Sequence, residues 1–225
     1  MQPAVVVVGA DAPFGAAIVQ RLAGDDHRVI ALAYDALPGD CTGARAGSLE
    51  AVDLAAFMKR EFPDVRPRAM VYVPRRTVAR SIEATAVEDL VGVTDATLVG
   101  AEVAARYFLE HRDRNVPGQL VLMSGWAAMG LPFATAAAAA SGGLIGLARS
   151  WALELAPSGI GVNAVVAGAG VEDSPWESAP RPIGRAPTEH EIAHAVAFFV
   201  DPRSHAINGQ VLFVCGGLTP GIIPA

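Results

Sequence analysis

The 225-residue sequence has few charged residues, a single lysine and only two cysteines. Two cysteines are too few for the disulfide framework of a small secreted domain, so we expect a reducing, cytoplasmic location. With 18% charged residues and a net charge of −6, the sequence predicts no basic surface for nucleic acid. Membrane insertion is not expected either, because the alanine-rich run at 134–140 is too short and too weakly hydrophobic to span a bilayer.

Apolar residues are abundant, in short runs that alternate with helical patterns. They make up 52% of the chain, enough for one sizeable core, and we expect a single domain over residues 1–225. The alternation predicts a doubly wound, Rossmann-type parallel α/β sheet of about seven strands. Strands are expected at 4–8, 28–33, just before 46, 69–73, 119–123, 161–166 and 210–214. Helices are expected at 12–22, 49–62, 87–112, 134–155 and 188–200, the last with a capping box of Thr188 and Glu191.

Several sequence motifs occur in a characteristic order along nearly the whole chain. They are VVVVGADAPFGAAIVQRLA, GQLVLMSGWA, ELAPSGIGVNAVVAG and INGQVLFVCGG. In this order and at this spacing they resemble the short-chain dehydrogenase/reductase family. The resemblance implies a Rossmann fold, an NAD(P) site at the first glycine turn, and catalysis by serine, tyrosine and lysine.

The catalytic positions of the family are degenerate in this sequence. Its Tyr-x-x-x-Lys motif aligns with Ala138 and Gly142, and no Tyr-x-x-x-Lys pair occurs anywhere in the chain. The family's serine lies thirteen residues before the tyrosine, which here is Gly125, and its helical asparagine aligns with Thr97. Ser124 lies one residue early and is expected to face the other side of its strand. Without the tyrosine and lysine, the family's proton transfer is predicted to be absent.

The glycine turn that holds the cofactor in the family is also altered. The family pattern T-G-x-x-x-G-x-G keeps its outer glycines as Gly9 and Gly15, but Pro13 replaces the middle one. Proline has no N–H and its ring obstructs a pyrophosphate. Asp11 is expected to cap the following helix, with its carboxylate in the place of a phosphate. We therefore expect no cofactor in this chain, and only a vestigial, disrupted turn.

The surfaces by which the family forms oligomers are retained. The resemblance implies that the contact between subunits is made by the long helices 87–112 and 134–155. The second of these helices is rich in small residues. We interpret the chain as a non-catalytic subunit that pairs with a homologous catalytic subunit carrying NAD(P), as a heterodimer or heterotetramer. Heteromeric relatives of this kind include hydroxyacyl-CoA dehydrogenases, so an acyl-CoA-type substrate is expected for the complex.

Two other readings of the sequence stay open. The first is non-redox chemistry on the same scaffold, such as a cyclase, lyase or dehalogenase, using Ser124, Tyr72, Arg75 or Asp11. The second is an NAD(P)-binding sensor without turnover.

Two further features bear on the site. About twenty residues separate Gly168 from Thr188, roughly half of what the family usually places there, which predicts a shortened substrate lid. His190 and His194 have a metal-like spacing, but no third ligand is evident and no metal site is predicted.

Overall fold

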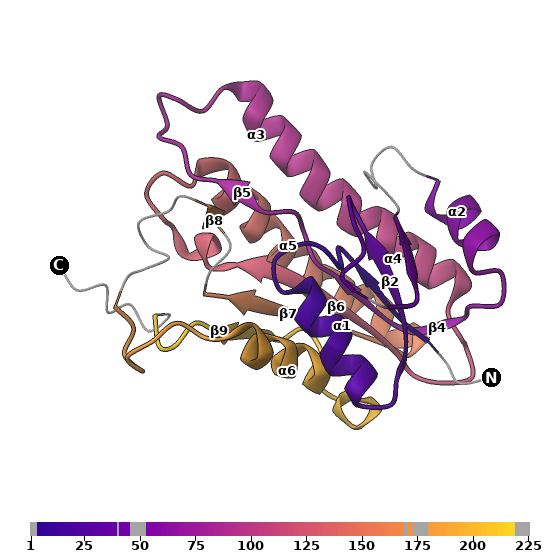
Figure 1. Cartoon of the computed structure of the whole chain (residues 1–225). Helices are drawn as coiled ribbons and strands as arrows, with labels where there is room; N and C mark the ends of the chain where they lie inside the picture. The colour runs from indigo at the N-terminus through magenta and orange to yellow at the C-terminus, as the bar shows by residue number, and fades with distance from the viewer. Residues whose placement is uncertain (1–3, 40, 46–52, 169–170, 173–179, 219–225) are drawn as a thin grey trace.

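The computed structural model describes residues 4–39, 41–45, 53–168, 171–172 and 180–218, and a parallel sheet lies at its centre (Figure 1). Seven strands are ordered β3-β2-β1-β4-β6-β7-β9, which confirms the predicted Rossmann-type sheet. The strands are β1 (Ala4–Val8), β2 (Arg28–Ala33), β3 (Gly43–Arg45), β4 (Pro67–Tyr72), β6 (Gly118–Gly125), β7 (Ile160–Ala167) and β9 (Val211–Val214). The strand order reverses between β1 and β4, which is where open α/β sheets bind ligands.

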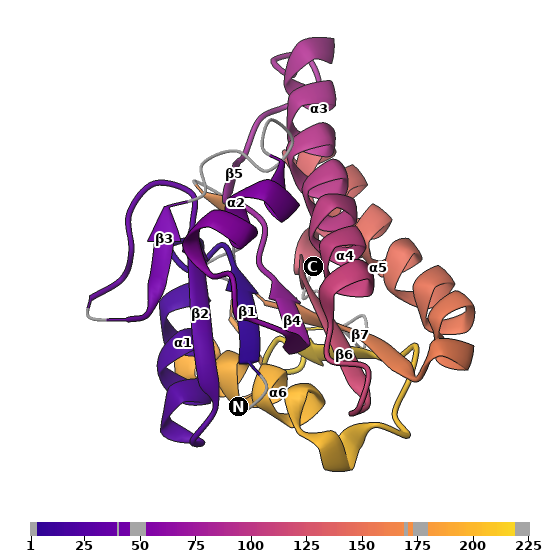
Figure 2. The same ribbon diagram turned by 90° about the vertical axis from the view of Figure 1, so that its right-hand side faces the viewer.

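Helices cover both faces of the sheet because the central strands are apolar on both sides (Figure 2). One face packs against α1 (Gly15–Gly24) and α6 (Glu189–Val200). The other packs against α2 (Leu54–Glu61), α4 (Gly100–His111) and α5 (Thr135–Leu155). Within β1, Val5 and Val7 belong to the first core and Val6 and Val8 to the second, as the alternation of side chains along a strand requires.

The helix expected at 87–112 is continuous but not uniform. It consists of α3 (Val87–Thr94), a π-helical turn η2 (Asp95–Val99) and α4. The hydroxyl of Tyr72 donates to the carbonyl of Ala96 in this turn, at 3.0 Å. At Gly100, the first residue of α4, an added Cβ would lie 2.6 Å from the same hydroxyl. The wider turn therefore occurs where Tyr72 from β4 lies against the helix.

Two helices begin later than expected, and a third begins as predicted. α1 begins at Gly15 instead of residue 12, because Phe14 takes a left-handed conformation with φ of 70°. α2 begins at Leu54 with Asp53 as its N-cap, and residues 49–52 of the expected helix lie outside the described residues. α6 has the predicted capping box of Thr188 and Glu191.

Short segments pair across the carboxyl end of the sheet. β5 (Thr77–Val78) and β8 (Val171–Glu172) form a two-stranded parallel sheet, and the main chain of Arg80 bonds to Phe133. These pairs fix the loop after β4 beside the segment after β7. In the described parts of 168–188, β8 is the one regular element, so no helical lid is present there.

The remaining regular segments are short 3₁₀ turns: η3 (Trp126–Met129), η4 (Ala156–Ser158) and η5 (Pro202–Ser204). Within the described residues, no helix is both long enough and apolar enough to cross a membrane.

Candidate functional site

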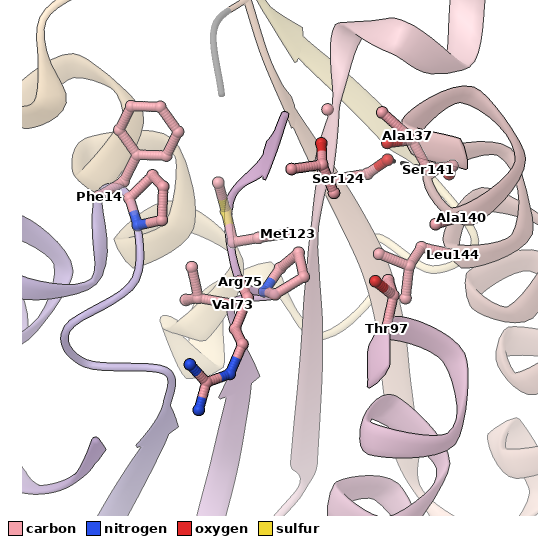
Figure 3. A pocket seen from close by; sticks show the side chains of 14 residues that line it. Phe14, Val73, Arg75, Thr97, Met123, Ser124, Ala137, Ala140, Ser141 and Leu144 are labelled. Carbon is pink, nitrogen blue, oxygen red and sulfur yellow. Dashed lines mark hydrogen bonds between the residues drawn. The ribbon is translucent and has the colours of Figure 1, made fainter. Parts of the chain in front are cut away.

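A small cavity lies between the carboxyl ends of β4 and β6 and the helices η2 and α5 (Figure 3). Its volume is about 50 Å³. A single water occupies about 30 Å³ of the liquid, and small-molecule pockets are typically about 300–1,000 Å³. The cavity therefore has room for a water molecule or two and none for a substrate. Its lining residues are Pro13, Phe14, Val73, Pro74, Arg75, Thr77, Thr97, Met123, Ser124, Gly125, Ala137, Ala140, Ser141 and Leu144.

Ser124 faces this cavity, so the expectation that it faces the opposite side of β6 is wrong. Its side chain is directed toward α5 (Figure 3), and its hydroxyl donates to the carbonyl oxygen of Ser141 at 3.0 Å. The side chain is buried at 4% exposure. Its hydrogen bond goes to a main-chain carbonyl, and no histidine, lysine or carboxylate lines the cavity beside it. Ser124 is therefore not activated as a nucleophile by any residue of this lining.

The helix residues that line the cavity lie one position before those expected. Ala137 and Ser141 line it, whereas Ala138 and Gly142 do not. Ala138 is partly buried against the cluster of Ala127, Ala134 and Ala137, and Gly142 is exposed. The family's motif is thus best placed on Ala137 and Ser141. Counting back thirteen residues from Ala137 gives Ser124 in place of Gly125. Ser124 and Ala137 thus have the spacing expected between the family's serine and tyrosine, and the α5 residues at this place in the cavity lining are Ala137 and Ser141.

Thr97 also lines the cavity, opposite Ser124. It lies within the π-helical turn η2 and is buried at 6% exposure. The position expected for the family's asparagine therefore does face the site. The polar side chains of the lining are hydroxyls and the Arg75 guanidinium, without a carboxylate, imidazole or amine.

Asp11 does not cap α1, which corrects a second expectation. The N-cap residue is Phe14, and it makes no side-chain cap hydrogen bond. The Asp11 carboxylate instead accepts the amide N–H groups of Tyr34 at 2.7 Å, Asp35 at 2.6 Å and Ala36 at 3.1 Å. Burial alone would raise the pKa of Asp11, but these three amides, together with the N–H of Asp11 itself, hold the pKa below its usual value.

Arg75 extends the contacts of Asp11 to a third loop. Its guanidinium donates to Asp35 at 2.9 Å and lies 4.4 Å from the centre of the Tyr34 ring. The Tyr34 hydroxyl donates to the carbonyl of Val73 at 2.8 Å, and burial raises the pKa of that phenol well above its usual value. We call Asp11, Tyr34, Asp35 and Arg75 the edge network, since they join the loops after β1, β2 and β4.

The glycine turn is held by main-chain contacts with β2 and with the residue after β4. The N–H groups of Gly9 and Ala10 both donate to the carbonyl of Leu32, at 2.8 and 3.0 Å. An added Cβ at Gly9 would lie 2.1 Å from the carbonyl oxygen of Val73, and one at Gly15 would lie 2.2 Å from that of Gly9. Both glycines are therefore required by close approach of the protein's own backbone.

A larger hollow of about 550 Å³ lies beside the edge network. It is lined by three carboxylate and two guanidinium side chains, and Pro13 supplies no N–H there. The full lining is Asp11, Ala12, Pro13, Phe14, Ala16, Tyr34, Asp35, Arg75, Arg76 and Glu189. This balance of charge does not fit a phosphate-rich ligand.

The described residues hold no group of three histidine, cysteine or acidic side chains able to bind a metal ion. His194 lies 3.5 Å from the guanidinium of Arg21 instead of facing a second ligand.

Residues 64–219 match the protein family described as enoyl-(acyl carrier protein) reductase. The (2S)-[(R)-hydroxy(phenyl)methyl]succinyl-CoA dehydrogenase subunit BbsC of Thauera aromatica is 31% identical, over 94% of this chain and 92% of that protein. Subunit BbsD of the dehydrogenase of that name, from the same organism, is 26% identical over 95% and 86%.

Among solved structures, the TT0495 protein from Thermus thermophilus has a TM-score of 0.85 at 21% identity, covering 98% of this chain and 100% of that one. A short-chain dehydrogenase/reductase from Serratia marcescens has a TM-score of 0.84 at 23% identity, covering 97% and 98%. The fold, the family match and the BbsC similarity define the class: this chain belongs to the short-chain dehydrogenase/reductase family.

Proposed function

We propose that this protein is a non-catalytic subunit that pairs with a homologous, catalytic short-chain dehydrogenase/reductase carrying NAD(P), acting on an acyl-CoA-type substrate. The observation that carries the proposal is the pair Ala137 and Ser141, which brings no acid or base to the cavity. Proton transfer needs a positioned group whose pKa is matched to the task. An alanine methyl group cannot supply it, and no lysine is available, since Lys59 lines a separate hollow between α2 and α4.

The edge network supports the absence of a cofactor. In an active Rossmann site, a helix N-terminus and free main-chain N–H groups face the pyrophosphate. Here the Asp11 carboxylate accepts hydrogen bonds from three main-chain N–H groups at and after the end of β2. The carbonyl of Leu32 accepts hydrogen bonds from two N–H groups of the glycine turn. A phosphate placed about 4 Å from Asp11 would be repelled by about 1–4 kcal/mol, depending on the local dielectric. These residues therefore do not fit a dinucleotide.

A catalytic partner is supported by the two Thauera aromatica relatives. BbsC and BbsD are named as subunits of one dehydrogenase whose substrate is an acyl-CoA, and both align with nearly the whole of this chain. Two homologous chains in one enzyme give the precedent for a division of labour. We infer a similar arrangement here, with the catalytic residues on the other chain.

The outer surface of the long helices supports pairing with another subunit. On α5, Gly142 and Gly146 have open space around them, and Leu153 is 82% exposed. On the neighbouring helix, Val87 is 70% exposed and Val91 is 51% exposed. Apolar side chains and small residues that share one helix pair are typical of an interface.

Co-expression with a relative that has the Tyr-x-x-x-Lys motif, from the same genome, tests the proposal. We expect a stable mixed complex by light scattering, with NAD(P)-dependent activity that is lost when the relative's tyrosine is replaced by phenylalanine. A pair that never co-purifies would refute the proposal.

The non-redox alternative is less well supported because the cavity at Ser124 is only about 50 Å³. The sensor alternative requires NAD(P) to bind this chain alone, and calorimetric titration at millimolar cofactor tests it. Saturable binding would favour the sensor over the proposed subunit.

A further inference from the structure

A groove of about 390 Å³ lies on the outer surface of α4 and α5, toward their carboxyl ends. Its lining is Glu102, Ala105, Arg106, Leu109, Glu110, Trp151, Glu154 and Leu155, which we call the acidic groove. The indole of Trp151 is half-buried and packs on the core under the two helices. The groove is thus an apolar and aromatic floor with charged side chains around it.

The charge of the acidic groove is unbalanced. Three glutamates line it against one arginine, and Arg106 is already paired with Glu102 through a hydrogen bond of 3.0 Å from its Nε. That hydrogen bond is the main cause of a raised pKa for Arg106. Glu110 and Glu154 make no ion pair within 4 Å in the described part of the chain. The carboxylates of Glu110 and Glu154 therefore lack a direct ion pair, although Glu110 is close enough to Arg106 to help raise the pKa of that guanidinium.

The glycine side of α5 and the acidic groove are two different parts of the helix surface. Gly142, Gly146 and Leu153 share one exposed side of α5, because they are spaced by four and seven residues. Trp151 and Glu154 are two residues before and one residue after Leu153, so they face away from that side, toward α4.

We propose that the acidic groove receives a cationic side chain of the catalytic subunit, an arginine for preference, laid on Trp151 between Glu110 and Glu154. The inference rests on the proposed function and adds the chemistry of the partner's surface. A guanidinium is planar, so it can stack on an indole ring and donate hydrogen bonds to carboxylates around its own edge. An ammonium group has no such plane and combines the two contacts less well. Charge complementarity of this kind selects one partner over another.

The negative charge of the acidic groove disfavours a contact in which two copies of this chain meet through their grooves. A two-fold contact brings the same patch from both copies into one interface. Six carboxylates would then face two arginines that are already paired. Like charges opposed across an interface penalise that assembly, so the groove favours a mixed complex.

The test compares Glu110→Lys/Glu154→Lys with Glu61→Lys/Asp64→Lys, which changes the net charge by the same amount on exposed residues of α2 and the following turn. Each full-length variant is titrated with the purified Tyr-x-x-x-Lys relative from the same genome. The readouts are the dissociation constant, its dependence on NaCl, and the mass of each chain alone.

We expect the groove variant to bind at least about tenfold more weakly and to lose most of the salt dependence. The control variant and the wild type should bind alike, and melting temperatures confirm that each chain is folded. If the wild type forms the complex and the groove variant binds equally well, this inference fails while the proposed function stands. If no mixed complex forms, both fail. A wild-type homodimer that Glu110→Lys/Glu154→Lys dissociates would assign the groove to a second copy and overturn the inference.

Discussion

Asp11 and Asp35, at the ends of neighbouring strands, are joined by a hydrogen bond of 2.6 Å from the Asp35 amide to the Asp11 carboxylate. The Asp35 carboxylate in turn accepts from Arg75, which follows β4. Along this series of contacts, the Asp11 carboxylate is followed by the Asp35 amide, the Asp35 carboxylate and the Arg75 guanidinium. The two negative charges are therefore separated by a hydrogen-bonding group. The loops after β1, β2 and β4 are thus joined at this edge of the sheet by side chains of the protein.

We predict that Asp11→Ala destabilises the chain by about 1 kcal/mol, because it leaves three main-chain N–H groups without their acceptor. Water can reach some of these groups, which keeps the loss at the lower end of the usual range. The measurement is the free energy of unfolding in urea.

Asp64→Ala is the control for this comparison, since Asp64 is exposed in the turn after α2. Its stability should match that of the wild type within about 0.5 kcal/mol. An Asp11→Ala protein as stable as the control would mean that the edge network does not hold these loops together.

Glu191 gives a prediction about pH. The side chain of Arg185, and then the amide and hydroxyl of Thr188, lower the pKa of Glu191 from its usual 4.5 to about 2. A lowered pKa in the folded state means that the stabilisation is present above the unfolded pKa and is lost as the pH falls toward the folded one. We expect the melting temperature of the wild type to exceed that of Glu191→Gln above pH 4.5, and the difference to vanish near pH 2.

Glu83→Gln, at an exposed residue, should follow the wild type over the same pH range. A constant difference between wild type and Glu191→Gln across the titration would show that the capping box contributes through shape and not through charge.

The sheet and its helices were predictable because they depend on the period of apolar residues, which is local in the sequence. The cavity residues were missed by one position for a physical reason. In the run from Ala136 to Ala140 all side chains are the same, so nothing in it marks which alanine faces the strand. The retained spacing of thirteen residues between Ser124 and Ala137 was the available signal. The role of Asp11 was not readable, since its partners are 23 to 25 residues away.

Introducing a tyrosine and a lysine into the cavity lining tests the proposal that this chain does not bind a dinucleotide, independently of its catalytic residues. We predict that Ala137→Tyr/Ser141→Lys has no NAD(P)-dependent activity on a set of hydroxyacyl-CoA thioesters and no NADPH binding by fluorescence. A cavity of about 50 Å³ does not fit the added ring, so a stability loss of about 1–3 kcal/mol is also expected. Activity in this variant would show that the edge network still admits a dinucleotide.

A substitution at Gly142 is expected to change the stability of the isolated chain and its binding to a partner in opposite directions. It lies inside α5 with no atom within 4 Å of an added Cβ, so Gly142→Ala should stabilise the isolated chain by about 0.5–1 kcal/mol. The same methyl group would hold a partner helix away, because small residues set how closely two helices approach. The complex with the catalytic relative should therefore weaken, measured as a larger dissociation constant. Gly24→Ala, in α1 and equally open, should raise or maintain stability without any change in binding. If both variants bind the relative as tightly as the wild type, the partner does not pack along this side of α5.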